Sequence, residues 1–255
     1  MTKIEFSGER SSLYKQALND YPSARTMDLE MMTRYLHPSP EEVILEIGAG
    51  SGFFSGHIAD ALKPTGHLLV SDPSEEQLEE VLNLRRSNIE IVEAGAHELT
   101  SVDDSKFDAV WSFGAIHHAF KKTEAFSHFY RVLKPGGRLI IVDVLTGSDL
   151  AKHFDSQVAK FCVVGHEVAF MSREYMRTLS EVAGFEQIEI VDLPIQWLFK
   201  SKEDVGDFLY KLHAMTKTTR EECLRGAEEI LGIEELHGQF LLNWPLSVLV
   251  CNKPL

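Results

Sequence analysis

The chain is poor in cysteine and in cationic side chains, and it has no long apolar run. Its three cysteines, Cys162, Cys223 and Cys251, are odd in number and far apart, so neither a disulfide framework nor a Cys-x-x-Cys metal motif is apparent. Lys and Arg total 25 against 39 Asp and Glu, and the net charge of -14 disfavours a broad polyanion-binding surface. No stretch approaches membrane-spanning length. We therefore expect a cytoplasmic protein that binds a small molecule, and neither nucleic acid nor a membrane.

Histidine is more frequent, but it shows no metal-binding pattern. The 11 histidines include no His-x-x-x-His or His-Glu arrangement with a third ligand nearby, so we expect no bound metal. The 255 residues and the hydrophobic content of 44% are sufficient for one sizeable domain, or for one domain with a small lid.

Apolar segments of strand length alternate with segments of helical periodicity. This alternation predicts an α/β protein with a doubly wound, mostly parallel sheet covered by helices on both faces. The predicted strands cover residues 43–47, 68–72, 89–92, 106–112, 139–144, 185–191 and 246–250.

The most informative stretch is residues 43–52, an apolar strand that ends in an acid and three alternate glycines. Gly48, Gly50 and Gly52 allow a sharp turn and a close approach of backbone to ligand, while the following helix presents unpaired N–H groups. The stretch therefore predicts a cofactor that contains a nucleoside.

Two departures argue against a dinucleotide. The third glycine of G-x-G-x-x-G would fall at Phe53, and Glu46 would repel a pyrophosphate but attract an amino group.

Asp72 lies 20 residues after Gly52, at the end of the second strand, where an acid binds ribose hydroxyls in such sheets. An acid in the loop before a helix is the alternative role for Asp72.

Three motifs resemble those of class I S-adenosylmethionine-dependent methyltransferases that act on small molecules. They are Glu46-Ile-Gly-Ala-Gly-Ser-Gly52, Phe107-Asp-Ala-Val110 and Arg131-Val-Leu-Lys-Pro-Gly-Gly137. The resemblance implies a Rossmann-like sheet of seven strands, the last of them antiparallel, and S-adenosylmethionine as methyl donor. It also implies methyl transfer to an oxygen, nitrogen or carbon atom of a partly apolar metabolite by in-line displacement.

The resemblance also implies which residues bind the cofactor. Ala96 stands where the family usually has an aspartate that meets the adenine amino group, so backbone amides or His97 would serve there instead. An N-terminal arm with Tyr21 and Arg25 would fold over the cofactor, or would only anchor a cap helix. The complete predicted set is Tyr21, Arg25, Glu46, Gly48, Ala49, Gly50, Gly52, Asp72, Pro73, Ala96, His97, Phe113 and Gly114.

His117 and His118 are the candidate catalytic bases, because they follow the strand end that borders the methionine half of the cofactor in this family. They could equally be hydrogen-bonding wall residues. Two of the predicted substrate-binding residues lie after strand five, where the family usually lines its acceptor site, and two tryptophans would add aromatic walls or would only pack. The four residues are His153, His166, Trp197 and Trp244.

We expect four segments: an N-terminal helical cap (1–42), a cofactor-binding core (43–192), a helical lid (193–243) and the final strand of the core sheet (244–255). Three other functions stay open. An arsenite-type methyltransferase would use Cys162, but Phe53 and Phe54 follow the glycine turn where no cysteine is present. The others are an NAD-dependent oxidoreductase and a catalytically silent cofactor-binding module.

Overall fold

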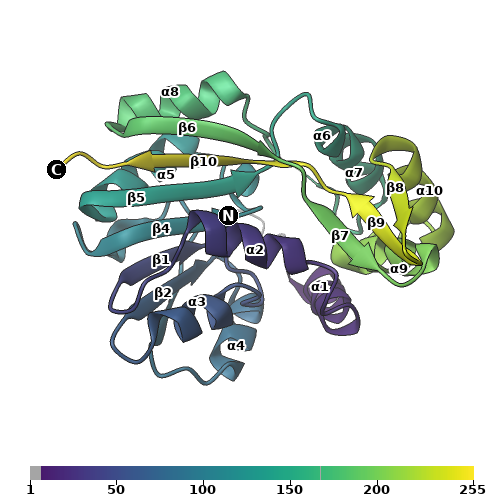
Figure 1. Ribbon diagram of the computed structural model, residues 1–255, viewed down its shortest axis with the longest axis horizontal. Helices are drawn as coiled ribbons and strands as arrows, with labels where there is room; N and C mark the ends of the chain where they lie inside the picture. The colour runs from purple at the N-terminus through teal and green to yellow at the C-terminus, as the bar shows by residue number, and fades with distance from the viewer. Residues whose placement is uncertain (1–6, 167) are drawn as a thin grey trace. The chain divides into compact units, whose positions relative to one another are not determined.

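The computed structural model describes residues 7–166 and 168–255, which divide into two compact units (Figure 1). The first unit comprises the segments Met1–Glu30, Thr146–Glu167 and Leu193–Leu246, as far as they are described. The second comprises Met31–Leu145, Val168–Asp192 and Ser247–Leu255. The division cuts the predicted cap after Glu30 and assigns residues 146–166 of the predicted core to the first unit.

The second unit carries a seven-stranded sheet, as the sequence predicted. The strand order is β3-β2-β1-β4-β5-β10-β6. Strands β1 to β5 pair in parallel, whereas β10 pairs antiparallel with β5. The order reverses between β1 and β4, and ligands of such sheets bind outside the strand ends at this reversal. The bounds are β1 Val43–Ile47, β2 His67–Asp72, β3 Ile89–Glu93, β4 Phe107–Phe113, β5 Leu133–Asp143, β6 Glu186–Leu193 and β10 Leu246–Asn252.

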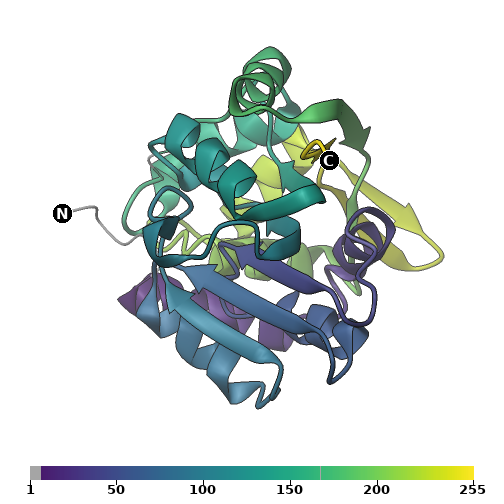
Figure 2. The ribbon, with the colours of Figure 1, turned by 90° about the vertical axis from the view of Figure 1, so that its left-hand side faces the viewer.

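The central strands are apolar because helices cover them. Ile44 and Leu45 of β1 and Ile140 and Ile141 of β5 are fully buried, as expected for strands with two covered faces. Figure 2 shows the sheet and its helices from the side. The helices of this unit are α3 Ser55–Leu62, α4 Glu75–Asn83, α5 Lys122–Val132 and α8 Arg173–Ala183, with short 3-10 turns η1 Leu99–Ser101 and η2 Ile116–His118.

The first unit contains more than the helices that were predicted. Residues 193–243 form α9 (Lys202–Leu212) and α10 (Arg220–Ile230) as expected, but also a three-stranded antiparallel sheet of order β7-β9-β8. The predicted helices are therefore present, and the small sheet is an addition that the sequence did not predict. Strand β8 is short and mostly exposed, and its sequence shows little of the apolar alternation by which a strand is recognised. Its pairing with β9 holds it in the sheet. The strands are β7 Gln196–Phe199, β8 Ile233–Leu236 and β9 Gln239–Asn243.

The rest of this unit comes from the N-terminus and from the segment after β5. The helices there are α1 Gly8–Asp20, α6 Asp149–His153 and α7 Ala159–Phe161, with a π-helical turn η3 at Phe154–Val158 between the last two. Helix α2, Thr26–Tyr35, runs along the chain from the first unit into the second.

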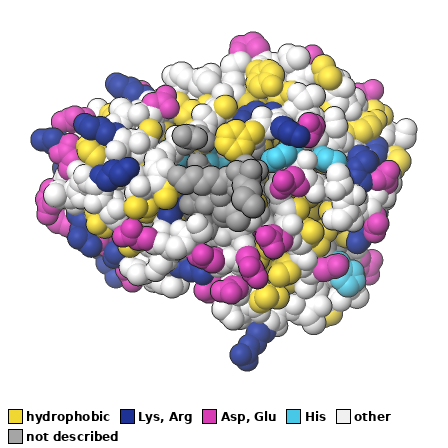
Figure 3. All heavy atoms as spheres, turned by 180° about the vertical axis from the view of Figure 1, so that it is seen from behind, with side chains coloured by type: hydrophobic (Ala, Val, Ile, Leu, Met, Phe, Trp, Pro, Cys, Tyr) yellow, Lys and Arg dark blue, Asp and Glu magenta, His cyan; other side chains and the backbone are white. Residues whose placement is uncertain are grey.

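Acidic side chains outnumber basic ones in the sequence, but the surface carries both. Figure 3 shows Lys and Arg side chains interspersed with Asp and Glu over the face that it draws. Among the described residues, no helix has the length and apolar character needed to cross a membrane.

The crossing of α9 and α10 in the first unit depends on Gly206. A Cβ there would lie 2.5 Å from the carbonyl oxygen of Arg220 and 3.0 Å from the Cβ of Leu224. We expect Gly206→Ala to lower the free energy of unfolding by roughly 1–3 kcal/mol, because the helices must move apart. Urea denaturation measures this loss.

Gly226→Ala, on α10, is the matched control. The three atoms nearest to its Cβ would all belong to the side chain of Gln157, which has other rotamers by which to move away. Alanine also gains about 0.5–1 kcal/mol of helix propensity over glycine at both positions. Equal losses in the two variants would show that the α9–α10 crossing does not depend on Gly206.

Candidate functional site

The turn after β1 adopts the backbone conformation that its glycines allow. Gly48, Gly50 and Gly52 have φ values of +66°, +56° and +83°. The amide of Gly48 donates to the carbonyl of Ser71 at 2.7 Å, which ties the turn to β2. A Cβ at Gly48 would lie 2.3 Å from the Cβ of Ala115, so the turn also lies close against the loop after β4. Ala49 continues this turn and is buried.

Asp72 ends β2 beside this turn. Its Oδ2 accepts the Gly50 N–H at 2.8 Å and its Oδ1 accepts the Ser74 N–H at 2.9 Å, while Pro73 between them is exposed. Burial raises the pKa of Asp72 to about 6, although the two hydrogen bonds by themselves would lower it. Because a carboxylate offers about four lone-pair sites, each oxygen can accept a further hydroxyl donor.

Glu46 is the last but one residue of β1 and is only 1% exposed. Its Oε2 accepts the Ser55 hydroxyl at 2.5 Å. Burial raises the pKa of Glu46 to about 8, the Ser55 hydrogen bond opposes this, and the charge of Asp72 adds to it. No Lys or Arg among the described residues forms an ion pair with Glu46. The site therefore holds a buried acid whose negative form lacks a counter-ion.

The loop after β3 lies beside the end of β2. The Ala94 amide donates to the carbonyl of Asp72 at 3.1 Å, and Glu98 accepts the Gly95 amide at 3.1 Å. Ala96 is buried and His97 half-buried. The Nδ1 atom of His97 is buried without a hydrogen-bond partner in the described part of the chain. The loop thus places backbone amides and one imidazole at this sheet edge.

The end of β4 combines an aromatic wall with a glycine. The ring centroid of Phe113 lies 4.8 Å from that of Phe54 and 6.0 Å from that of Trp111. Gly114 has a φ of +63°, and a Cβ there would meet no atom of the described residues within 4 Å. The chain therefore leaves space beside Gly114 and an apolar surface next to it.

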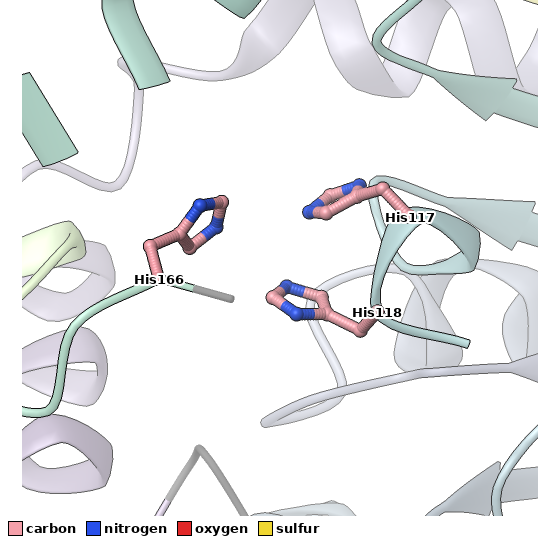
Figure 4. Close-up of side chains that lie close together, drawn as sticks. All are labelled: His117, His118 and His166. Carbon is pink, nitrogen blue, oxygen red and sulfur yellow. The ribbon is translucent and has the colours of Figure 1, made fainter. Parts of the chain in front are cut away.

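The turn η2 that follows carries both candidate bases. Nδ1 of His117 lies 2.6 Å from Oδ1 of Asp143, and the His117 amide donates to Oδ2 at 2.9 Å. Burial tends to raise the pKa of Asp143, but His117 and the amide of Val144 hold it below its usual range. Figure 4 shows His117 and His118 projecting from the same turn, with ring centroids 4.2 Å apart. The third imidazole drawn there, His166, belongs to the first unit.

Tyr21 and Arg25, predicted to reach the cofactor, already have partners within the first unit. The Tyr21 hydroxyl donates to Asp207 Oδ2 at 2.8 Å, and burial together with Asp207 raises its pKa. The Arg25 Nε donates to Asp28 Oδ2 at 2.5 Å in a buried ion pair. This arrangement corresponds to the anchoring role that the sequence left open, and cofactor contact by either residue stays a prediction.

The predicted substrate residues share one aromatic cluster in the first unit. The ring centroids of Trp197 and Trp244 are stacked 3.9 Å apart, and that of His153 lies 6.0 Å from Trp244. Phe154 links His166 to the cluster at 4.9 Å. Burial lowers the pKa of His153 to about 4, and neither ring nitrogen has a partner among the described residues. Their binding of substrate stays a prediction.

Residues 45–141 match the family model described as "Methyltransferase domain". Residues 45–141 are therefore a domain of the methyltransferase family that this model describes. The match runs from β1 into β5, so it includes the glycine turn, Asp72 and the turn that carries His117.

Known proteins similar to this chain differ in what they act on. An arsenite methyltransferase from Halobacterium salinarum is 28% identical over 180 residues, which cover 67% of this chain and 45% of the relative. A ubiquinone/menaquinone biosynthesis C-methyltransferase from Pseudomonas entomophila is 29% identical over 145 residues, which cover 54% of this chain and 56% of the relative. This chain thus spans about half the length of each relative.

Solved structures agree on the fold. A putative methyltransferase from Bacillus halodurans has a TM-score of 0.62 at 21% identity, with 90% of this chain and 100% of that chain covered. Phosphoethanolamine N-methyltransferase 2 from Haemonchus contortus, solved with S-adenosyl-L-methionine, has a TM-score of 0.66 at 18% identity. That match covers 96% of this chain and 57% of the Haemonchus chain.

The sequence did not point to two residues of the candidate site. Asp143 is the last residue of β5, as Asp72 is of β2, and Glu46 is the last but one of β1, so an acid at the end of an apolar strand was a usable signal. Ser55 gave no comparable signal, because a serine at the start of a helix usually caps it. Here its hydroxyl binds Glu46 instead.

Proposed function

We propose that this methyltransferase binds S-adenosylmethionine at the carboxyl ends of β1, β2 and β4 and methylates a small, partly apolar metabolite. The observation that carries the proposal is the turn of three left-handed glycines bound to Asp72, beside the buried Glu46 that lacks a counter-ion. A dinucleotide would place its negatively charged pyrophosphate near Glu46. The charges of Glu46 and Asp72 at this edge disfavour that arrangement.

The residues fit the parts of that cofactor. Asp72 would accept the ribose hydroxyls with its remaining lone pairs, and Glu46 would receive the ammonium group of the methionine half. The amides of Ala96 and His97 would meet the adenine. When bound, the cofactor supplies a methyl group already activated on a sulfonium, so the protein mainly aligns the acceptor and excludes water.

His117 would remove the proton of a hydroxyl or carbon acceptor. Since Asp143 accepts from Nδ1, the lone pair of a neutral ring lies on Nε2, which is the atom that would take the proton. Asp143 also binds the His117 amide, so the ring and its backbone are oriented by one carboxylate. His118 lies beside this pair as the second candidate base.

An arsenic acceptor has less support in this chain. Arsenic is bound by exposed thiolates, whereas Cys162, Cys223 and Cys251 are all buried in the described structure. Burial raises the pKa of both Cys223 and Cys251 to about 12, which disfavours their thiolates. These residues favour an oxygen, nitrogen or carbon acceptor.

Thermal unfolding with S-adenosylmethionine, S-adenosylhomocysteine or NAD, each in a separate sample, tests the proposal. A ligand that binds the native state alone, at 100 times its Kd, stabilises the protein by about 2.7 kcal/mol. We expect stabilisation by the two methionine-derived ligands. Stabilisation by NAD alone would instead support an oxidoreductase, and binding without methyl transfer to any metabolite would support a silent module.

Asp72→Ala should weaken S-adenosylhomocysteine binding by roughly 10- to 100-fold, the loss expected for hydrogen bonds to a charged group. Isothermal titration calorimetry measures the affinity. Asp60→Ala is the matched control, because Asp60 is an exposed acid of the same unit that pairs only with Arg86 in the described contacts. Unchanged affinity in Asp72→Ala would remove the ribose assignment.

A further inference from the structure

A buried lysine lies against the turn that carries the candidate base. Lys122, at the start of α5, is 6% exposed. Its Nζ donates to the carbonyl of Ala119 at 2.8 Å and to the carbonyl of His117 at 3.4 Å. Burial lowers the pKa of Lys122, and the charge of Asp143 opposes that change. A buried ammonium is costly, so this one requires a nearby negative charge.

Lys122 and Asp143 hold the same residue from two sides. Asp143, 0% exposed, binds the amide and ring Nδ1 of His117, whereas Lys122 binds its carbonyl. In the second unit, the described groups that contact His117 include Asp143 from β5, Lys122 from α5, its neighbour His118, the uncharged ring of Phe170 and the amide of Ala169.

We infer that Lys122 is a positioning residue that balances the charge of Asp143 and thereby keeps His117 in the neutral form that accepts a proton. A buried carboxylate needs a compensating positive charge, which either the Lys122 ammonium or a His117 imidazolium can supply. With the ammonium present, the imidazole does not have to carry that charge. The inference rests on the proposed role of His117 as base.

The neighbouring lysine offers a matched comparison. Lys121 precedes Lys122 and pairs with Glu124 at 3.1 Å, with both side chains more than half exposed at 60% and 54%. Solvent screens this charge strongly. Lys121→Gln therefore removes the same charge one residue away without changing the surroundings of Asp143.

The test is a nitrogen-15 NMR titration of the His117 ring in the whole protein, assigned by comparison with His117→Gln. Lys122→Gln keeps a hydrogen-bond donor but removes the charge, and it should raise the pH midpoint of His117 by roughly one pH unit. Lys122→Arg and Lys121→Gln should leave the midpoint within a few tenths of a unit.

A midpoint that stays unchanged in Lys122→Gln would overturn the inference, because Lys122 would then only hold the turn by its hydrogen bonds. Lys122→Met is a second neutral variant. If Lys122→Gln does not fold, the midpoint of His117 is measured in Lys122→Met instead. The titration needs neither cofactor nor acceptor. Failure of the wild-type protein to bind S-adenosylmethionine would therefore reject the proposed function and leave this result standing.

A second readout links the inference to the reaction. If His117 is the base, the acid limb of the pH profile for methyl transfer should move to higher pH in Lys122→Gln by the same amount as the NMR midpoint. S-adenosylhomocysteine affinity should stay within about twofold of the wild type. A moved midpoint with an unmoved profile would assign the base to another group, while loss of both shifts would overturn the role of Lys122.

Discussion

Glu46→Gln is expected to stabilise the ligand-free protein and, at the same time, to weaken its binding of S-adenosylmethionine. The pKa of Glu46 is about 8 in the fold, against an ordinary value of 4.5. Between these pH values the unfolded chain releases a proton that the folded protein retains, so the stability of the wild type falls as pH rises. Glutamine removes this loss. The variant should gain roughly 2–4 kcal/mol over the wild type at pH 8.

Urea denaturation at pH 5 and pH 8.5 measures the stability, and calorimetry with S-adenosylmethionine measures the affinity. The affinity should fall by roughly 10- to 100-fold, since an amide does not balance the ammonium charge. Glu42→Gln is the control of opposite sign. Burial tends to raise the pKa of Glu42, but hydrogen bonds from Arg138 and Ser39 hold it below its usual value. Its replacement should therefore destabilise the protein above pH 4.5. A Glu46→Gln variant less stable than the wild type at both pH values would contradict the buried, uncompensated acid.

The second large effect concerns catalysis. His117→Gln should lower methyl transfer by about 10²- to 10⁴-fold, the range that a positioned general base contributes. Its affinity for S-adenosylhomocysteine should change less than twofold, because His117 is assigned to the acceptor and not to the cofactor. Transfer of a labelled methyl group into a fractionated metabolite extract measures turnover before the acceptor is identified.

His118→Gln is the comparison that decides between the two imidazoles. Asp143 binds the ring and amide of His117, so we expect the His118 variant to retain more activity. Asp143→Asn should lower turnover as well, because an amide no longer favours the tautomer with the lone pair on Nε2. Full turnover in His117→Gln would reject His117 as the base, and full turnover in both histidine variants would reject base catalysis by this turn.

The sheet and its glycine turn could be predicted because their signals are local. Buried parallel strands are recognisable as apolar runs, and an acid or glycine at the end of such a run lies at one known edge of the sheet. Glu46 and Asp72 were found in this way. The backbone of the glycine turn follows from three residues that tolerate positive φ.

Long-range pairing could not be predicted in the same way. Asp143 and His117 are 26 residues apart, and their contact depends on how far β4 and β5 are offset in the sheet. Arg25 is bound by Asp28 one helical turn later, whereas the sequence left cofactor contact and anchoring of the cap helix open. The β7-β9-β8 sheet depends on pairing between short segments with little alternation of their own.

The position of β10 has a consequence for how the chain is made. β5 ends at Asp143 and β10 begins at Leu246, yet the two are neighbours in the sheet. At a synthesis rate of roughly 5–20 residues per second, the edge of β5 stays unpaired for about 5 to 20 seconds until β10 has been synthesised. An unpaired edge of Leu, Ile and Val residues is prone to aggregation during that interval. Slower translation between β5 and β10 should therefore lower the yield of folded protein, even though the finished sheet would be the same.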